Sequence, residues 1–366
     1  MASIPRIAVV GFGLIGRRHA EVLRRSPEFS LAGVVEPQEA SRIDASELGI
    51  PVFASLAEMF DQLVPDGVVL ATPTPLHIEQ GLVCIEKGCP VLIEKPIAVT
   101  VADAGTLTEA AVKAGVPLLI GHHRRHNGMV KAAKQALASG AIGDVRSVQA
   151  TCWFYKPDHY FEVAPWRTKK GAGPISVNLV HDVDLLRHFC GEVKTVQAVA
   201  VPSARGFENE DLATAILVFR SGAVATISVS DSVVAPWSWE LTARENPAYP
   251  ATNQSCYLIG GSKGGLSLPD LRVWRHESEA DWWTPISATS LTCGSSDPLA
   301  VQMAHFVQVI AGSETPLVSG VEGMRSLEVV EAIASSASNG VAVKIGERND
   351  VEEQYFASEA ASTIPR

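Results

Sequence analysis

The segment GPISVNLVHDVDLL, residues 173–186, holds the side chains best suited to move a proton. A helix over residues 178–190 would place an apolar stripe on one side and His181 with Asp184 on the other, because its repeat is 3.6 residues. Asp184 is then close enough to fix the tautomer of the His181 imidazole, and Asn178 is placed to bind a hydroxyl group. A lone His-Asp spacing is equally typical of a solvated polar face, so the segment alone leaves both interpretations open.

The glycine-rich sequence GFGLIG is the strongest motif. Gly11, Gly13 and Gly16 follow the β-branched run RIAVVG and open a helix over residues 14–25, and Glu36 ends the next strand. In this context the glycines bring backbone N–H groups against a pyrophosphate, and Glu36 accepts hydrogen bonds from the ribose hydroxyls. A carboxylate there would repel a 2′-phosphate, so we expect NAD rather than NADP. The same site includes Phe12, Leu14 and Ile15. The alternative is a glycine turn that serves packing only.

Two further stretches end strands of the same sheet, where ligands of such folds collect. They are ATPTPLH, residues 71–77, and EKPIA, residues 94–98. Pro96 holds Lys95 extended, and a cis peptide bond is one way to do so. A lysine here is either a solvated strand end or a group beside the nicotinamide. The residues expected near the cofactor from these stretches are Ala71, Thr72, Pro73, His77, Glu94 and Lys95.

Length and periodicity predict two domains. A chain of 366 residues exceeds the size at which one core usually keeps growing. Residues 1–124 alternate short apolar strands with amphipathic helices, which predicts a doubly wound parallel sheet. Residues 125–366 contain longer, partly alternating runs, which predict a mainly antiparallel sheet with one exposed face. Two helices are expected near residues 298–311 and 323–339.

Charge and composition exclude several classes of protein. The net charge is -10 and no basic stripe is present, so nucleic acid is not an expected partner. The start, MASIPRIAVVGFG, has no charged segment followed by an apolar one, and no run reaches membrane-spanning length. We therefore expect a cytoplasmic protein. Six cysteines without a CxxC pair predict buried free thiols.

The run HHRRH, residues 122–126, invites a metal-binding interpretation. Its three histidines have no carboxylate or cysteine companion at a ligand spacing, so no metal is expected. Arg124 and Arg125 are interpreted as structural residues or substrate contacts.

Six motifs together resemble one known family. They are GFGLIG, ATPTPLH, EKPIA, GHHRRH, WRTKKGAG with NLVHDVDLLR, and DPLAVQMAHF with EAIASSASNG, and they span nearly the whole chain in order. This pattern resembles the glucose-fructose oxidoreductase and inositol dehydrogenase (Gfo/Idh/MocA) family. The resemblance implies a Rossmann domain and an α/β domain with a large open sheet. It also implies NAD(P)-dependent oxidation of a sugar or polyol hydroxyl, or reduction of the ketone, by a homodimer or homotetramer associated through that sheet.

The resemblance also assigns roles to single residues. Lys95 matches the lysine that contacts the reacting hydroxyl, and Trp166 with Arg167 matches a pair near the nicotinamide. His123 stands where the family often has an asparagine near the cofactor. The family usually has an aspartate four residues before the histidine of the glycine-rich segment. Here His181 is present, but the earlier position is Val177.

Proton chemistry favours His181 as the general base. An unperturbed histidine titrates near pH 6.5, whereas Lys95 would need its pKa lowered by roughly three units, about 4 kcal/mol. We therefore assign Lys95 as the cation that polarises the oxygen. The substrate-binding residues expected are Asn178, Arg167, Tyr160 and Asp184. Other residues that could line a substrate cleft are Lys156, Asp158 and His159, while Trp237 and Trp239 either offer an apolar sugar face or pack, which is the favoured interpretation.

Two alternatives stay open. One is a cis-dihydrodiol dehydrogenase of aromatic catabolism, in which Arg124 or Arg167 clamps a carboxylate. The other is a catalytically silent dinucleotide-binding sensor or partner protein. Val177 supports that alternative, and the retention of Lys95 with His181 argues against it.

Overall fold

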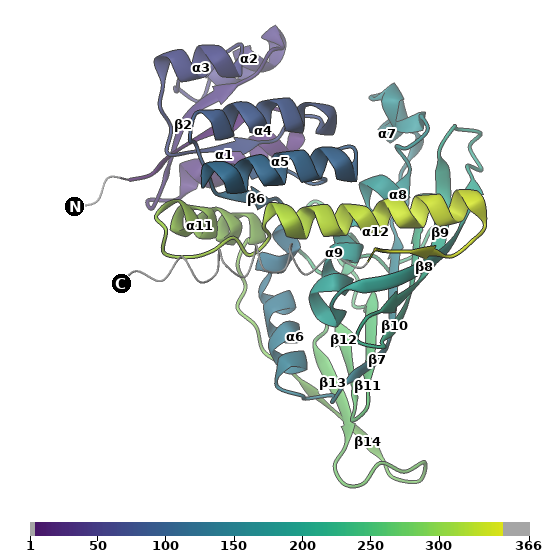
Figure 1. Cartoon of the computed structure of the whole chain (residues 1–366). Helices are drawn as coiled ribbons and strands as arrows, with labels where there is room; N and C mark the ends of the chain where they lie inside the picture. The colour runs from purple at the N-terminus through teal and green to yellow at the C-terminus, as the bar shows by residue number, and fades with distance from the viewer. Residues whose placement is uncertain (1–3, 347–366) are drawn as a thin grey trace.

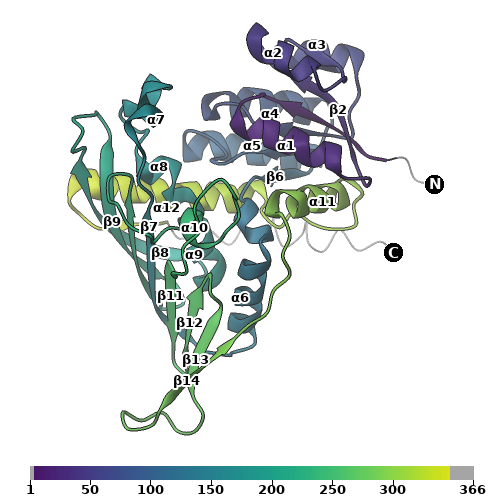
Figure 2. The same ribbon diagram turned by 180° about the vertical axis from the view of Figure 1, so that it is seen from behind.

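The computed structural model describes residues 4–346 and contains two β-sheets (Figures 1 and 2). The first sheet is parallel, with six strands in the order β3-β2-β1-β4-β5-β6. This order is that of a doubly wound dinucleotide-binding sheet, so the predicted fold of the first part is confirmed. The strands are β1 (Arg6–Val10), β2 (Ser30–Val35), β3 (Val52–Phe53), β4 (Gly67–Leu70), β5 (Val91–Ile93) and β6 (Leu118–Ile120).

Helices cover both faces of this sheet because its central strands are apolar along their whole length. Residues 7–10 of β1 are all fully buried or nearly so, so side chains on both sides of the strand need cover. The connecting helices are α1 (Leu14–Arg25), α2 (Glu39–Ser46), α3 (Leu56–Gln62), α4 (His77–Glu86) and α5 (Val101–Ala114), with the 3-10 turn η1 (Thr74–Leu76) before α4. The predicted bounds of α1 match the structure.

The second sheet has nine strands in the order β14-β13-β12-β11-β7-β10-β9-β8-β15. Within the described residues, β7 and β10 form its single parallel pair, and the other neighbours are antiparallel. The predicted mainly antiparallel sheet is therefore confirmed. Its strands are β7 (Val145–Trp153), β8 (Val193–Pro202), β9 (Glu210–Phe219), β10 (Val224–Ser230), β11 (Tyr257–Gly261), β12 (Gly265–Leu268), β13 (Arg272–His276), β14 (Ile286–Ser290) and β15 (Val343–Lys344).

One face of this second sheet is covered and the other is open. Strand β9 alternates accordingly, with Ala213, Ala215 and Leu217 buried and Thr214 and Ile216 exposed. The covering helices are α6 (Gly128–Ala138), α9 (Leu179–Cys190) and α12 (Gly320–Asn339). Shorter elements are η2 (His123–His126), α7 (Asp158–Glu162), η3 (Pro165–Thr168), α8 (Pro174–Val177) and α10 (Trp239–Thr242). The hairpin of β13 and β14 projects from the far end of the molecule (Figure 2).

The chain returns to the first sheet near its end. Helix α11 (Pro298–Ile310) lies against the first domain (Figure 1), where Met303 and Phe306 share one core with Ile7 and Val9 of β1. Helix α12 then runs back along the second sheet (Figure 1). The boundary between residues 124 and 125 stays a prediction, and residues 347–366 of the predicted second domain lie outside the described residues.

The cysteines and the helices agree with most of what the sequence predicts. All six cysteines are free thiols, and five are buried, but Cys293 is exposed, so the expectation of burial is wrong for that residue. None of the helices formed by residues 4–346 is long and apolar enough to cross a membrane.

Candidate active site

The glycine loop leaves room for a ligand at the start of α1. A Cβ on Gly11, whose φ is +90°, would lie 2.7 Å from the carbonyl oxygen of Ala71, and one on Gly16 would collide with the carbonyl of Gly11. Gly13, in contrast, faces open space and is the N-cap of α1 without a side-chain cap. The first N–H groups of α1 are therefore free, and no acidic side chain stands in its first turn. This arrangement fits a pyrophosphate.

Glu36 is fixed beside this loop. Its Oε2 accepts a hydrogen bond from the backbone N–H of Phe12 at 2.8 Å, and its Oε1 accepts from Gln38 at 2.9 Å. A carboxylate has about four acceptor positions, so two remain for ribose hydroxyls. Leu14 is largely exposed on the first turn of α1, where it borders the same space.

His77 holds two loops together rather than facing a ligand. Its ring is fully buried, with Nε2 2.9 Å from the carbonyl oxygen of Thr72 and Nδ1 3.0 Å from that of Pro96. Burial lowers the pKa of His77, and the hydrogen bonds to the two carbonyl oxygens oppose that shift. The expectation that His77 contacts the cofactor is therefore corrected: it braces the loops that follow β4 and β5.

Glu94 is paired with a residue that the sequence analysis missed. Nε2 of His19, on α1, lies 2.7 Å from Oε1 of Glu94, and both side chains are buried. Burial alone would raise the pKa of Glu94, but the hydrogen bond and the charges of His19, His123 and Lys95 lower it. The signal was available, because position 19 falls on the buried stripe of α1 with positions 16, 20 and 23.

Lys95 and His181 approach each other from different domains. The Lys95–Pro96 peptide bond is cis, and Nζ of Lys95 donates to the carbonyl oxygen of Val177 at 3.4 Å. Burial lowers the pKa of Lys95, with Glu94 opposing the shift. The pKa of His181 lies well below its usual range because of burial and then the charge of Lys95.

His181 has no acidic partner among residues 4–346. Its Nδ1 is buried and makes no hydrogen bond within the part of the chain that the structure describes. The ring instead packs edge-on against His123, with centroids 5.3 Å apart, and His122, at 6.2 Å. His123 in turn has Nε2 3.6 Å from a carboxylate oxygen of Glu245. The imidazole is neutral because its pKa is lowered. It lies beside His123, the first residue of η2.

Asp184 has a structural role, and the prediction that it orients His181 is wrong. Helix α9 is buried on all sides, with His188 its single partly exposed residue, so no solvated face exists. The Asp184 oxygens accept from Nε and Nη2 of Arg125 at 2.9 and 2.8 Å, and from the Ser326 hydroxyl at 3.1 Å. The position is 1% exposed, so Asp184 is also unavailable as a substrate-binding residue.

Arg124 completes this buried network. It donates to Asp182 at 3.1 Å and to Glu240 at 2.8 Å, and its guanidinium packs over the ring of Trp239. Tyr257 donates to the same oxygen of Asp182. Arg124, at the end of the predicted first domain, thus pairs with Asp182 and Glu240 of the second. The buried ion pairs of Arg124 and Arg125 support the structural interpretation of both residues, and Trp239 packs against Arg124.

A second cluster surrounds Tyr160. Nζ of Lys156 donates to Oδ1 of Asn178 at 2.7 Å and lies 5.2 Å from the Tyr160 ring. Nη1 of Arg167 donates to the Tyr160 carbonyl oxygen at 2.6 Å, and its Cζ lies 3.9 Å from the same ring. Trp166 is 58% exposed next to Arg167. Asp158 and His159, on α7, are exposed as well.

The fold and the site define the class of protein as a nicotinamide-dependent oxidoreductase. The features that define it are the dinucleotide-binding sheet, the glycine loop with Glu36, and Lys95 with His181 at the edge of that sheet. Residues 5–122 match the oxidoreductase family with an NAD-binding Rossmann fold, and residues 130–267 match the GFO/IDH/MocA C-terminal domain. The chain belongs to this family, and its first domain is an NAD-binding domain.

The chain is similar to characterised members over nearly its whole length. It is 25% identical to scyllo-inositol 2-dehydrogenase (NAD(+)) of Bacillus subtilis, over 96% of this chain and 98% of that protein. It is 27% identical to 1,5-anhydro-D-fructose reductase of Ensifer adhaerens, over 82% and 86%. The structure of the WlbA dehydrogenase from Bordetella pertussis with NADH and UDP-GlcNAcA superposes with a TM-score of 0.78 at 26% identity, covering 94% of this chain and all of that one.

Proposed function

We propose that the protein is an NAD-dependent dehydrogenase or reductase acting on the secondary hydroxyl or ketone of a sugar, sugar derivative or polyol. The observation that carries this proposal is the approach of Lys95 and His181 at the edge of the NAD-binding sheet. The names of the relatives, an inositol dehydrogenase and an anhydrofructose reductase, support the substrate class.

The residues that would hold NAD are the glycine loop with the free start of α1, Glu36, and the loops after β4, β5 and β6. NAD bound there would supply the hydride acceptor for oxidation of the carbon that carries the hydroxyl. Lys95 donates a hydrogen bond to the reacting oxygen and stabilises negative charge there. His181, neutral because of its lowered pKa, takes the hydroxyl proton on a ring nitrogen.

An enzyme is favoured over the alternatives because Lys95 and His181 are both retained and lie together. Neither a cis-dihydrodiol substrate nor a silent sensor is supported by a specific observation. A cytoplasmic location and the lack of a nucleic-acid partner remain predictions from the sequence.

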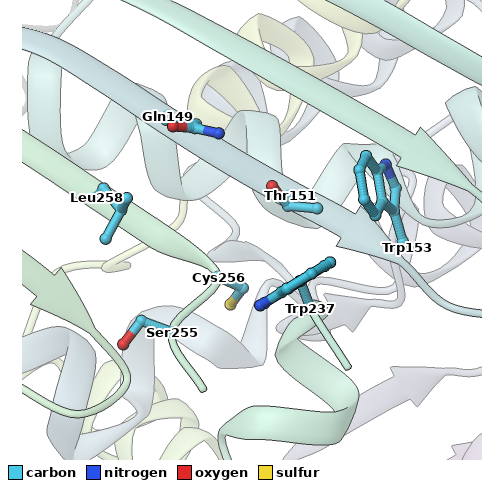
Figure 3. A pocket seen from close by; sticks show the side chains of 7 residues that line it. All are labelled: Gln149, Thr151, Trp153, Trp237, Ser255, Cys256 and Leu258. Carbon is cyan, nitrogen blue, oxygen red and sulfur yellow. The ribbon is translucent and has the colours of Figure 1, made fainter. Parts of the chain in front are cut away.

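We also propose that the protein associates with itself through the open face of the second sheet. We define an outer patch by side chains of β7, β9, β10 and β11, all exposed or partly exposed and all uncharged: Gln149, Thr151, Trp153, Thr214, Ile216, Thr226 and Leu258. Uncharged faces of this kind are typical of interfaces. A cavity of about 230 Å³ lies in the patch, so a partner has a recess to fill (Figure 3). Its lining residues are Gln149, Thr151, Trp153, Trp237, Ser255, Cys256 and Leu258.

The experiment that tests the activity is a screen of NADH formation with purified protein, NAD or NADP, and a panel of sugars, inositols and cyclic diols. Turnover with a sugar or polyol supports the proposal. Tight NAD binding by calorimetry without any turnover of the panel contradicts it and favours a sensor.

A further inference from the structure

Two ammonium groups, those of the partly buried Lys95 and the buried Lys156, are held by consecutive residues of the chain. Lys95 contacts the carbonyl oxygen of Val177 at 3.4 Å, and Lys156 contacts the side chain of Asn178 at 2.7 Å. The two lysines come from different domains and meet at the junction of α8 and α9. Their charges act on each other, since Lys156 contributes to the lowered pKa of Lys95.

These ammonium groups have few acceptors. Each carries three N–H donors, and within the described residues each makes one hydrogen bond. The negative charge of Glu240 acts on Lys156. Within the described residues the ion-pair partner of Lys156 is Asp231, with Oδ2 at 3.8 Å. Its other oxygen is bound by Arg205 at 2.9 Å, so Asp231 is already neutralised. The family resemblance places an aspartate at the position that Val177 occupies here, and valine brings no charge.

A third cation lies on the other side of the cluster. Arg167 and Lys156 both pack on the ring of Tyr160, and Arg167 contributes to the lowered pKa of Lys156. Nε of Arg167 is buried and has no partner within the described part of the chain. Lys156 and Arg167 therefore lie side by side on the Tyr160 ring, and both keep unused N–H donors.

We propose that the substrate is an acid of the sugar or polyol series, such as an aldonate or a uronate, whose carboxylate binds Lys156 and Arg167. This inference rests on the proposed function, because the hydroxyl of the same molecule occupies the place between Lys95 and His181. A carboxylate supplies both the acceptors that the donors lack and the negative charge that Val177 does not. Lys156 is thus a specificity-determining residue.

The test compares matched acids and neutral sugars on the NADH complex, with NADH fluorescence as the readout: D-glucuronate against D-glucose, and D-gluconate against D-glucitol. We expect at least one acid to bind about tenfold more tightly than its neutral partner. In Lys156→Met the ratio of the two affinities falls toward one, and Lys156→Arg keeps most of it. Equal affinities in the unmodified protein, or a ratio unchanged in Lys156→Met, overturn the inference.

Two measurements keep the test decisive if Lys156→Met does not fold. Raising NaCl from about 50 mM to about 500 mM weakens binding of the acid alone. Val177→Asp lowers the acid preference, whereas Val177→Asn, which has the shape of that aspartate without its charge, does not. An acid preference insensitive to both overturns the inference. Turnover of neutral sugars without a preference for acids would overturn this inference and leave the proposed function supported. Tighter binding of acids without any turnover would contradict the proposed dehydrogenase activity and still support the anion-binding site.

Discussion

His19 and Glu94 connect the glycine loop to the lysine of the candidate active site. The 2.7 Å contact between His19 Nε2 and Glu94 Oε1 links helix α1, whose N-cap is Gly13, to the residue before Lys95. Because both side chains are buried, their relative position is fixed, and the cofactor loop and the reacting lysine keep one geometry.

Removing His19 should therefore affect stability, NAD binding and turnover together. In His19→Ala, Glu94 stays buried without its partner, which costs about 3–5 kcal/mol of the free energy of unfolding. The control is the double variant His19→Ala with Glu94→Gln, in which no charge is stranded and part of the loss is recovered. Chemical denaturation and calorimetric titration with NAD measure both effects. Additive losses in the double variant would show that the two side chains are not coupled.

The pH dependence of kcat/KM should have limbs set by His181 and Lys95. His181 acts when neutral, and its pKa is well below 6.5, so the acid limb lies below pH 6.5. Lys95 acts when charged, and its pKa is lowered from 10.5, so activity falls before pH 10.5 is reached. In Lys95→Arg the side chain keeps its charge, so the alkaline limb disappears while turnover is reduced. In His181→Ala we expect turnover to fall about 10²-fold. If kcat/KM instead rises with pH as Lys95 loses its proton, Lys95 and not His181 is the base.

Glu36 should set the choice between NAD and NADP. Its carboxylate is held at the glycine loop by Phe12 and Gln38, so it meets the ribose at a fixed position. In Glu36→Gln the repulsion of a 2′-phosphate is gone, and the ratio of NADP to NAD affinity rises about tenfold. The matched control is Glu39→Gln, which removes an exposed carboxylate three residues away. An equal change in both variants would mean that net charge alone is responsible.

Self-association should depend on the outer patch. Ile216→Lys places a charge in the middle of the uncharged face, and desolvating it disfavours an interface there. We expect sedimentation velocity to show a smaller species at equal concentration. Val64→Lys changes an equally apolar but unrelated exposed residue, 81% accessible in the first domain, and should leave the mass as it is. A mass unchanged in Ile216→Lys would place the interface elsewhere.

The lowered pKa of His188 should make the protein less stable in mild acid. Burial, together with Arg125 and Lys134, lowers the pKa of His188 from 6.5 to about 4. The unfolded chain binds the proton first as the pH falls, so this contribution is present above pH 6.5 and is lost between pH 6.5 and 4. In His188→Gln the fall in unfolding free energy between pH 6.5 and 4.5 is smaller by about 1–2 kcal/mol. Parallel curves for the two proteins would exclude His188 as a source of the acid sensitivity.

The sequence predicted those features that depend on local pattern. The period of apolar residues distinguishes the parallel sheet from the antiparallel one, and the spacing of the glycines with Glu36 predicts the cofactor loop. The approach of Lys95 toward the start of α9 required the family resemblance, since 82 residues separate it from Val177.

The pattern of apolar residues along the sequence could not predict contacts between distant segments. Asp184 looks available at helical spacing from His181, but Arg125 takes both of its oxygens from another segment. His77 likewise lies between two carbonyls that only the folded loops bring together. In both cases an amphipathic pattern cannot show that the polar side of the helix is also covered.

Because α11 returns to the first sheet, the NAD-binding domain cannot be exchanged between relatives as one continuous segment. Met303 and Phe306 are fully buried against β1, and leaving them out would expose apolar surface worth about 1.5–3 kcal/mol for each side chain. The core of the NAD-binding half is therefore discontinuous: it is made of two stretches that lie far apart in the sequence. A chimera that exchanges cofactor preference between relatives must transplant both stretches, since a single cut after the sixth strand would give a donor fragment with an open core.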